Sequence, residues 1–218
     1  MTKHYDVTAL GEVLIDFTEN GSSAQGNPMY EANPGGAPCN VLAMLQKFGH
    51  KTAFLGKVGE DIFGRRLEIV LKEAGIDTAG LCMDPTVRTT LAFVEKKADG
   101  DRDFSFYRNP GADMMLRTEE LQEQILKDTR IFHFGTLSMT DEPVRSATRH
   151  AIETAKANGA MLSFDPNIRE PLWQSMEEAK RQTAYGMEVC DVLKISDNEI
   201  RWFLSLIHIS EPTRRSYI

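Results

Sequence analysis

Short apolar runs alternate with amphipathic segments along most of this 218-residue chain. Apolar runs predict strands at Asp6–Phe17, Thr52–Val58, Arg130–Gly135, Ala160–Phe164 and Asp191–Ile195. Apolar residues at helical spacing predict helices at Gly36–Phe48, Asp61–Gly75, Glu142–Asn158 and Ser175–Val189. Strands that alternate with helices form βαβ units, in which successive strands are parallel. The sequence therefore predicts an α/β fold with a mostly parallel sheet flanked by helices.

Two segments interrupt this alternation and predict a small β lid. Residues from about 18 to 33 are polar, rich in glycine and typical of a loop. Residues 89–107 predict a hairpin whose strands carry Leu91 and Phe93 on one side of the turn and Phe104 and Phe106 on the other. We expect one apolar face on this hairpin and a lid formed by residues 18–33 and 89–110 that covers a site.

The charge and cysteine content exclude several classes of function. The formal net charge is -7 and no run of Lys or Arg occurs, which disfavours nucleic-acid and membrane partners. The three cysteines match no metal motif and predict free thiols in a reducing compartment. The N-terminus has no apolar signal region and no stretch reaches the ~20 apolar residues of a membrane span. We therefore expect a cytoplasmic protein.

The last residues break the pattern of the rest of the chain. After Leu204 the sequence reads SLIHISEPTRRSYI, and Pro212 prevents a helix from resuming. The stretch SLIHISEPTR resembles a translated sequencing adapter. We therefore interpret 205–218 as a non-native tail and 1–204 as the N-terminal part of one domain, the alternative being an ordinary C-terminus with little pattern.

Polar side chains follow three predicted strands at the point where each strand ends. They are Asp16; Asp165, Asn167 and Arg169; and Lys194, Ser196 and Glu199. Ligands of open parallel sheets bind outside the carboxyl ends of the strands, so these side chains predict a binding site. From the residues alone, each has a second interpretation: Asp16 and the Asp165–Asn167 segment as turn formers, Arg169 and Lys194 as solvated cations. His133 lies inside a strand and is assigned to the core.

The segment Gly35–Asn40 opens a predicted helix with two glycines. Glycines let the backbone approach a ligand closely, and a helix N-terminus offers unpaired N–H groups. Asn40 adds a donor and an acceptor suited to a hydroxyl group. The alternative is a tight turn with only a capping role. The segment matches neither GxGxxG nor the Walker A loop, which disfavours a Rossmann oxidoreductase.

The run from Gly35 to Asp77, GGAPCNVLAMLQKFGHKTAFLGKVGEDIFGRRLEIVLKEAGID, resembles the first signature region of the PfkB-type (ribokinase-like) carbohydrate kinases. The pieces GEVLIDF, RNPGADMML, FDPNIREPLW and LKISDNEI are most similar to bacterial fructokinases. The resemblance covers about residues 4–204. It implies a ribokinase-like fold with a β lid.

The resemblance also implies roles for individual residues. The residues implied to bind the sugar are Asp16, Gly35, Gly36, Asn40, Phe106, Asn109, Asp113, Asp165 and Asn167. Arg169 is implied to face the transferring phosphate, and Lys194, Ser196 and Glu199 to lie near the ATP phosphates and the Mg²⁺ water network, with no direct metal ligand. Ser196 stands where many members carry Asn, which weakens the assignment of that residue alone.

The implied reaction is the ATP-dependent phosphorylation of fructose at its primary hydroxyl, with another ketose or a 2-keto-3-deoxy sugar acid as the competing substrate. The family's second signature, a DTxGAGD-like run that supplies an anion hole and the catalytic Asp, is absent from this sequence. We therefore expect the complete protein to be the kinase and this truncated chain to have no kinase activity of its own. The alternative is that the chain is a non-catalytic sugar-binding module or an inactive fragment. Lids of this family often pair between subunits, so the resemblance also implies a homodimer through the lid.

Overall fold

The computed structural model describes residues 3–96 and 102–206 and divides them between two sheets. The larger sheet has six strands in the order β10-β9-β8-β1-β4-β5, and every neighbouring pair is parallel. Its strands are β1 (Tyr5–Leu10), β4 (Thr52–Gly59), β5 (Asp77–Asp84), β8 (Thr129–Gly135), β9 (Met161–Asp165) and β10 (Val192–Leu193). The predicted parallel α/β fold is confirmed.

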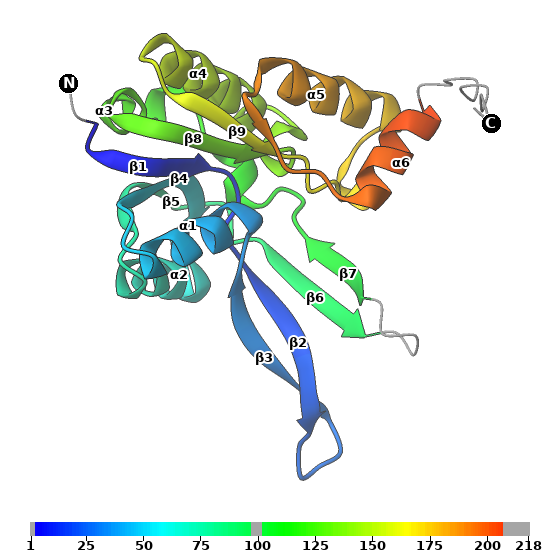
Figure 1. The fold of residues 1–218 in the computed structure, drawn as a ribbon. Coiled ribbons are helices and arrows are strands. Elements are labelled where there is room, and N and C mark those ends of the chain that lie inside the picture. Colours follow the sequence, from blue (N-terminus) through cyan, green and yellow to red (C-terminus); the bar gives the residue numbers. More distant parts are fainter. Residues whose placement is uncertain (1–2, 97–101, 207–218) are drawn as a thin grey trace.

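Helices cover both faces of the six-stranded sheet. They are α1 (Ala37–Lys47), α2 (Ile62–Glu73), α3 (Glu123–Lys127), α4 (Val144–Ala157), α5 (Met176–Val189) and α6 (Asp197–Leu206). Short 3₁₀ helices lie at Ala112–Met115, Thr118–Glu120, Leu137–Met139 and Glu170–Leu172. Figure 1 shows α1 and α2 on one side of the sheet and α4 and α5 on the other.

The two faces of the sheet bury separate apolar clusters because successive side chains of a strand point to opposite faces. Ala9 packs in the cluster under α1 and α2, whereas its neighbour Leu10 packs in the cluster under α4 and α5. Phe54 and Leu55 divide in the same way. A strand with apolar residues on both faces reads as a continuous apolar run, which explains why the runs were recognisable in the sequence.

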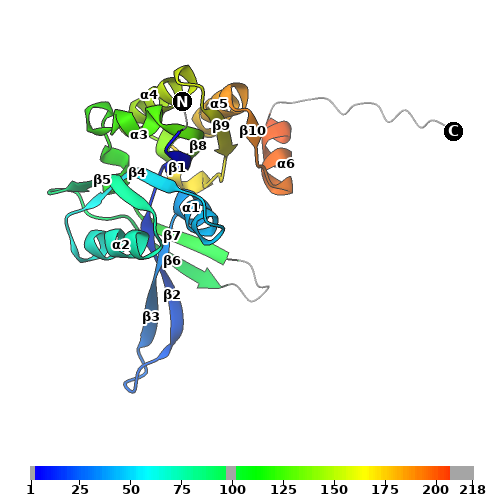
Figure 2. The same ribbon diagram turned by 60° about the vertical axis from the view of Figure 1, so that its left-hand side comes forward.

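The second sheet stands away from this body as the lid (Figures 1 and 2). Its four strands lie in the order β3-β2-β6-β7 and comprise β2 (Leu14–Ser22), β3 (Pro28–Gly35), β6 (Leu91–Lys96) and β7 (Arg102–Tyr107). The β6–β7 hairpin confirms the prediction for residues 89–107. Its turn, residues 97–101, lies outside the described residues.

Two predictions were wrong, and one strand was missed. The run Asp6–Phe17 is not one strand, because β1 ends at Leu10 and β2 begins at Leu14 in the other sheet. Residues 18–33 are not a loop, because most of them belong to β2 and β3, which pair in antiparallel orientation. Backbone pairing holds these strands together, and a polar, glycine-rich composition does not reveal it. Strand β5 gave no clear pattern and was not predicted, since only its residues Gly80 and Asp84 are buried.

The apolar face predicted for the β6–β7 hairpin was also wrong. Ala92 pairs with Phe106 and Val94 with Phe104, so the two phenylalanines of β7 share a face with Ala92 and Val94. Phe93 pairs with Ser105 and points to the opposite face, where it stacks on Phe17 with ring centroids 4.9 Å apart. Alternation within one strand does not reveal which residue of the next strand lies opposite.

The C-terminal elements differ slightly from expectation. The strand predicted at Asp191–Ile195 shortens to β10, and α6 continues to Leu206, two residues beyond the expected end of the domain. Residues 207–218, most of the segment interpreted as a non-native tail, lie outside the described residues. Within the described part of the chain, no helix combines the length and apolarity that crossing a bilayer requires.

Candidate functional site

A pocket of about 400 Å³ lies where the carboxyl ends of the large sheet meet the lid. Polar residues reach it from the ends of β1, β9 and β10, as expected for an open parallel sheet. It is lined by Glu12, Leu14, Asp16, Gly36, Ala37, Asn40, Val41, Phe104, Phe106, Leu137, Asp165, Asn167, Arg169 and Lys194. Eight of the predicted site residues thus come together in one cavity.

One part of the pocket lining comes from the lid and from α1. Asp16 lies on β2, where it pairs with Ala92 of β6, and Ala92 pairs in turn with Phe106. The register therefore places Asp16 and Phe106 on one face of the lid. Asn40 lies in the first turn of α1 and is exposed. Two apolar rings beside a carboxylate and an amide suit a polyhydroxylated ring that has one apolar face.

Two cations also line the pocket. Lys194 Nζ lies 3.2 Å from Asp165 Oδ1 and 3.1 Å from Asp165 Oδ2 at the ends of β10 and β9. Arg169 follows β9, and its guanidinium carbon lies 5.5 Å from the ring centroid of Phe104. Arg169, from the body, thus makes a cation–π contact with the ring of Phe104, from the lid. Both cations can bind an anionic ligand, because Arg169 is partly exposed and Lys194 is exposed.

The loop after β9 is held in a defined shape. Thr136 at the end of β8 donates from both its backbone N and its hydroxyl to the carbonyl oxygen of Pro166. Asn167 takes a left-handed φ of 44°, which Asn tolerates better than most residues. Glu199 Oε1 accepts from the backbone N of Ile168 at 3.0 Å. These bonds fix the positions of Asn167 and Arg169 relative to the sheet.

Ser196 and Glu199 form a capping box at the start of α6. Glu199 Oε2 accepts from the Ser196 backbone N at 2.9 Å, and Ser196 Oγ accepts from the Glu199 backbone N at 3.3 Å. Burial opposes the ionisation of Glu199, but the bonds from Ser196 and Ile168 outweigh it and hold the pKa of Glu199 below its ordinary value. Neither residue lines the pocket. Their observed contacts are structural.

Three other predicted residues also lie outside the pocket lining. Gly35 is buried behind it, against the carboxylate of Asp16. Asn109 is exposed. Asp113 is buried and accepts from Arg108 Nε at 2.7 Å and from Thr90 Oγ1 at 2.5 Å. Asp113 therefore neutralises a buried guanidinium, which gives it a structural partner instead of a position facing the pocket.

Sequence reasoning did not single out Glu12 or Phe104 as site residues. Glu12 is 4% exposed, and its Oε1 accepts from the backbone N of Ala37 at 2.9 Å. Burial raises the pKa of Glu12 to about 7. Glu12 could have been found as an acidic residue that follows a glycine at the end of a buried strand. Phe104 could have been found because it lies two positions before Phe106, which puts both rings on one face of the strand.

The helix N-terminus predicted to bind a ligand is partly occupied by the protein itself. The backbone N of Ala37, at the start of α1, donates to Glu12 instead of facing an open pocket. Gly36 adopts a φ of 119°, and a side chain there would strike the carbonyl oxygen of Glu12. The capping alternative left open for this turn is thus realised, together with the placement of Gly36 and Asn40 at the pocket.

His133 is buried in β8, as predicted, and its Nδ1 lies 3.0 Å from Ser163 Oγ. Burial lowers the pKa of His133 below its ordinary value. No group of three or more His, Cys, Asp or Glu side chains that could hold a metal ion forms within residues 3–96 and 102–206. A Mg²⁺ ion carried by nucleotide phosphates and water does not require such a group.

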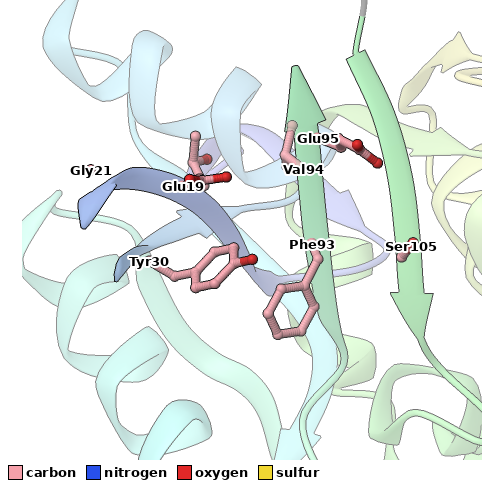
Figure 3. A pocket seen from close by; sticks show the side chains of 8 residues that line it. Glu19, Gly21, Tyr30, Phe93, Val94, Glu95 and Ser105 are labelled. Atoms are coloured by element: carbon pink, nitrogen blue, oxygen red, sulfur yellow. The ribbon is translucent and has the colours of Figure 1, made fainter. Parts of the chain in front are cut away.

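A larger hollow of about 560 Å³ lies elsewhere on the lid, where β2 and β6 cease to pair beyond Thr18 and Val94. Figure 3 shows Tyr30 and Phe93 side by side in it, with Glu19 and Glu95 nearby. None of the predicted site residues lines this hollow. We assign the site to the smaller pocket because only that pocket gathers acids, amides and cations from the strand ends.

Known proteins resemble this chain in sequence and in fold. The profile described as "pfkB family carbohydrate kinase" matches residues 5–213. "Probable fructokinase-2" of Arabidopsis thaliana is 43% identical over 212 residues, which are 96% of this chain and 64% of that protein. The crystal structure of fructokinase from Xylella fastidiosa has a TM-score of 0.87 at 35% identity and covers 93% of this chain and 62% of its own. Its ATP-bound form has a TM-score of 0.84 at 35% identity, with 93% and 61% covered. This chain spans less than two thirds of the length of these relatives.

Proposed function

The chain belongs to the PfkB family of carbohydrate kinases, and we propose on that basis that its pocket binds fructose for phosphorylation by ATP. In this reaction the primary hydroxyl oxygen of the sugar forms a bond to the γ-phosphorus of ATP. The bond between that phosphorus and the oxygen bridging the β- and γ-phosphates breaks, and ADP leaves. The hydroxyl proton passes to a base. The observation that carries the proposal is the pocket itself. It brings together a carboxylate and an amide, Asp16 and Asn40, with two cations, Arg169 and Lys194.

The pocket lining suits both substrates. The carboxylate of Asp16 accepts hydrogen bonds from sugar hydroxyls, and Asn40 both donates and accepts. Phe104 and Phe106 approach from the lid and exclude water from the sugar. Phosphoryl transfer relies on positioning and on stabilising the charge of the moving group, and Arg169 and Lys194 supply positive charge in the same pocket.

ATP is supported as the phosphate donor by the ATP-bound fructokinase from Xylella fastidiosa, whose fold this chain shares. A Mg²⁺ ion carried by the nucleotide would supply neutralisation of phosphate charge. In this chain, Lys194 is the side chain best placed for a phosphate oxygen, because its ion pair with Asp165 keeps the ammonium at the mouth of the pocket.

The lid also supports a proposed homodimer. Tyr30 and Tyr107 are 46% and 65% exposed beside Phe93, on the face of the lid that does not line the sugar pocket. An aromatic patch of this kind is suited to protein contact. Sedimentation analysis of the chain and of Tyr107→Glu tests this: a dimer that the substitution dissociates supports the proposal, and a monomer at all concentrations contradicts it.

The function is tested by a coupled kinase assay of a full-length chain that includes the second signature, with ATP and a panel of sugars. The panel holds fructose, other ketoses and 2-keto-3-deoxy sugar acids. Highest kcat/KM with fructose, together with fructose binding by the 218-residue chain in calorimetry, supports the proposal. A preference for a sugar acid would reassign Arg169 or Lys194 to the substrate carboxylate. No turnover with any sugar would overturn the kinase assignment.

A further inference from the structure

Glu12 is a buried carboxylate at the base of the sugar pocket that the proposed reaction does not use. It follows β1, is 4% exposed, and accepts from the backbone N of Ala37 at 2.9 Å. The first turn of α1 contains no acidic residue, and Gly36 has no side chain with which to cap it. A carboxylate 25 positions away in the sequence therefore performs the capping role that Ser, Thr or Asp usually performs locally.

Glu12 contacts the turn of residues 35–40 through two different groups. Its carboxylate holds the backbone N of Ala37, and its carbonyl oxygen lies so near Gly36 that a side chain there would meet it 2.5 Å away. On one side of Gly36, the residue Gly35 lies against the Asp16 carboxylate; on the other, α1 carries Asn40 to the pocket. Glu12 thus fixes the backbone between the two side chains proposed to bind the sugar.

The environment of Glu12 makes its charge sensitive to pH. Burial is the largest influence and raises its pKa to about 7, although the bond from Ala37 acts in the opposite direction. Asp113 raises this pKa further and Arg108 lowers it. The other titratable or charged groups that share a cavity or contact with Glu12 are Asp16, Cys39, His133, Asp165, Arg169 and Lys194. Burial lowers the pKa of His133 below its ordinary value.

A cavity of about 10 Å³ connects Glu12 to the end of β9. Its other lining residues include Thr136, Asp165 and Asn167. This volume approaches the space of a single water molecule, and polar side chains are among the lining residues. Glu12 therefore adjoins both the α1 turn and the β9 loop, two segments that contribute residues to the pocket.

We propose that Glu12 is a positioning residue of the sugar site: its ionised carboxylate holds the turn of residues 35–40 so that Asp16 and Asn40 face the pocket together, and proton uptake loosens this arrangement. The proposal rests on the proposed function, because it concerns binding of the sugar. It assigns Glu12 no contact with the substrate. Its effect passes through the backbone N of Ala37, to which an ionised acceptor bonds more strongly than a neutral one.

The test uses the 218-residue chain and two readouts. The first is the ¹⁵N shift of the Ala37 amide between pH 5.5 and 8.5, which reports the state of Glu12 without any ligand. The second is the fructose Kd from calorimetry at pH 6 and pH 8. We expect the Ala37 shift to titrate with a midpoint near pH 7. We expect the fructose Kd to be about fivefold higher at pH 6 than at pH 8, which corresponds to the weakening of one hydrogen bond.

Glu12→Gln keeps an acceptor of the same length but cannot ionise. We expect it to abolish the Ala37 titration and to bind fructose at both pH values as weakly as the wild type does at pH 6. Glu153→Gln, on the exposed surface of α4, is the matched control and should behave as the wild type. If Glu12→Gln does not fold, the wild-type titration alone decides.

An Ala37 resonance that stays constant from pH 5.5 to 8.5 overturns the proposal. So does an Ala37 titration without any change in the fructose Kd, and that outcome leaves the proposed function intact. Absence of fructose binding at every pH, with Ala37 still titrating, instead overturns the proposed substrate and with it the sugar-directed role of Glu12. The two failures are therefore distinguishable.

Discussion

The α-carbon of Gly35 lies directly against the carboxylate of Asp16, so that a methyl group on Gly35 would collide with Asp16 Oδ2. The two residues belong to neighbouring strands of the lid, β3 and β2. Gly35 does not have the left-handed φ of Gly36, so its backbone would accept a side chain. The glycine is therefore required by the position of one carboxylate and not by the fold of the turn.

Gly35→Ala should weaken fructose binding with little loss of stability. The added methyl group displaces the end of the Asp16 side chain, which is flexible, so the cost falls on the ligand site. We expect a Kd increase of about tenfold, corresponding to ~1.4 kcal/mol, and a nearly unchanged Tm. A double-mutant cycle with Asp16→Asn checks the cause: strong non-additivity is expected, and additive effects would show that Gly35 acts elsewhere.

Asp16→Asn should raise the fructose Kd while leaving ATP binding unchanged. Replacing the carboxylate removes a charged acceptor and leaves sugar hydroxyls with a weaker partner, a loss of ~1–3 kcal/mol. Calorimetry should therefore show an increase of about tenfold to a hundredfold. Glu153→Gln serves as the control for removing one negative charge far from the pocket. Equal losses in both variants would attribute the effect to net charge.

Arg169→Ala in a full-length chain with the second signature should lower kcat more than it raises the sugar KM. The guanidinium faces the pocket beside Phe104, where it can stabilise charge that develops on the transferring phosphoryl group. Loss of one such donor typically costs ~10²–10³ in rate. Arg169→Lys should recover only part of it, since an ammonium lacks the planar fork. A pure KM effect would move Arg169 to substrate binding.

Asp113→Asn should destabilise the fold without changing fructose affinity. The Arg108 and Asp113 side chains are 2% and 3% exposed, and the substitution leaves the guanidinium charge without its counter-ion. Breaking a buried pair on one side costs ~3–5 kcal/mol, which lowers the Tm by roughly 10 °C in a chain of this size. A thermal melt and calorimetry below the transition test this. A higher fructose Kd with an unchanged Tm would instead support a role for Asp113 in the sugar site.

Glu12 should make the fold less stable as pH rises from about 4.5 to about 7. Its pKa is raised from the ordinary 4.5 to about 7, chiefly by burial, so in this window the folded state binds a proton that the unfolded state has lost. The free energy of unfolding then falls by up to roughly 3 kcal/mol.

Glu12→Gln should flatten this part of the pH dependence, as measured by denaturant melts at pH 5 and pH 8. Carboxyls whose pKa is lowered, such as Glu199 and Asp61, contribute in the opposite sense and at lower pH, because their stabilisation is lost as pH falls through the folded-state pKa. A wild-type stability that rises between pH 5 and pH 8 would contradict the assignment to Glu12.

The sequence by itself determined the parallel α/β body and the polar ends of its strands. Period-two and period-3.6 patterns are local properties, so the strand at Thr52–Gly59 and the helix capped by Asp61 were predicted nearly as they occur. Parallel strands place their carboxyl ends at one edge of the sheet. The sequence therefore predicted that the polar residues after these strands lie together, and the pocket contains Asp165, Asn167, Arg169 and Lys194.

Only the tertiary structure decided the strand pairing of the lid and the partners of the buried charges. Strand β2 pairs with β6 through Ile15 and Leu91, and no local pattern specifies a register between segments so far apart. That register places Phe104, not Phe93, over the pocket. Likewise, Asp113 is a structural residue because Arg108 is buried beside it, and Glu12 holds Ala37 because the fold buries its carboxylate there. Burial and long-range pairing are properties of the assembled chain, which is why the same residues carried no such signal in the sequence.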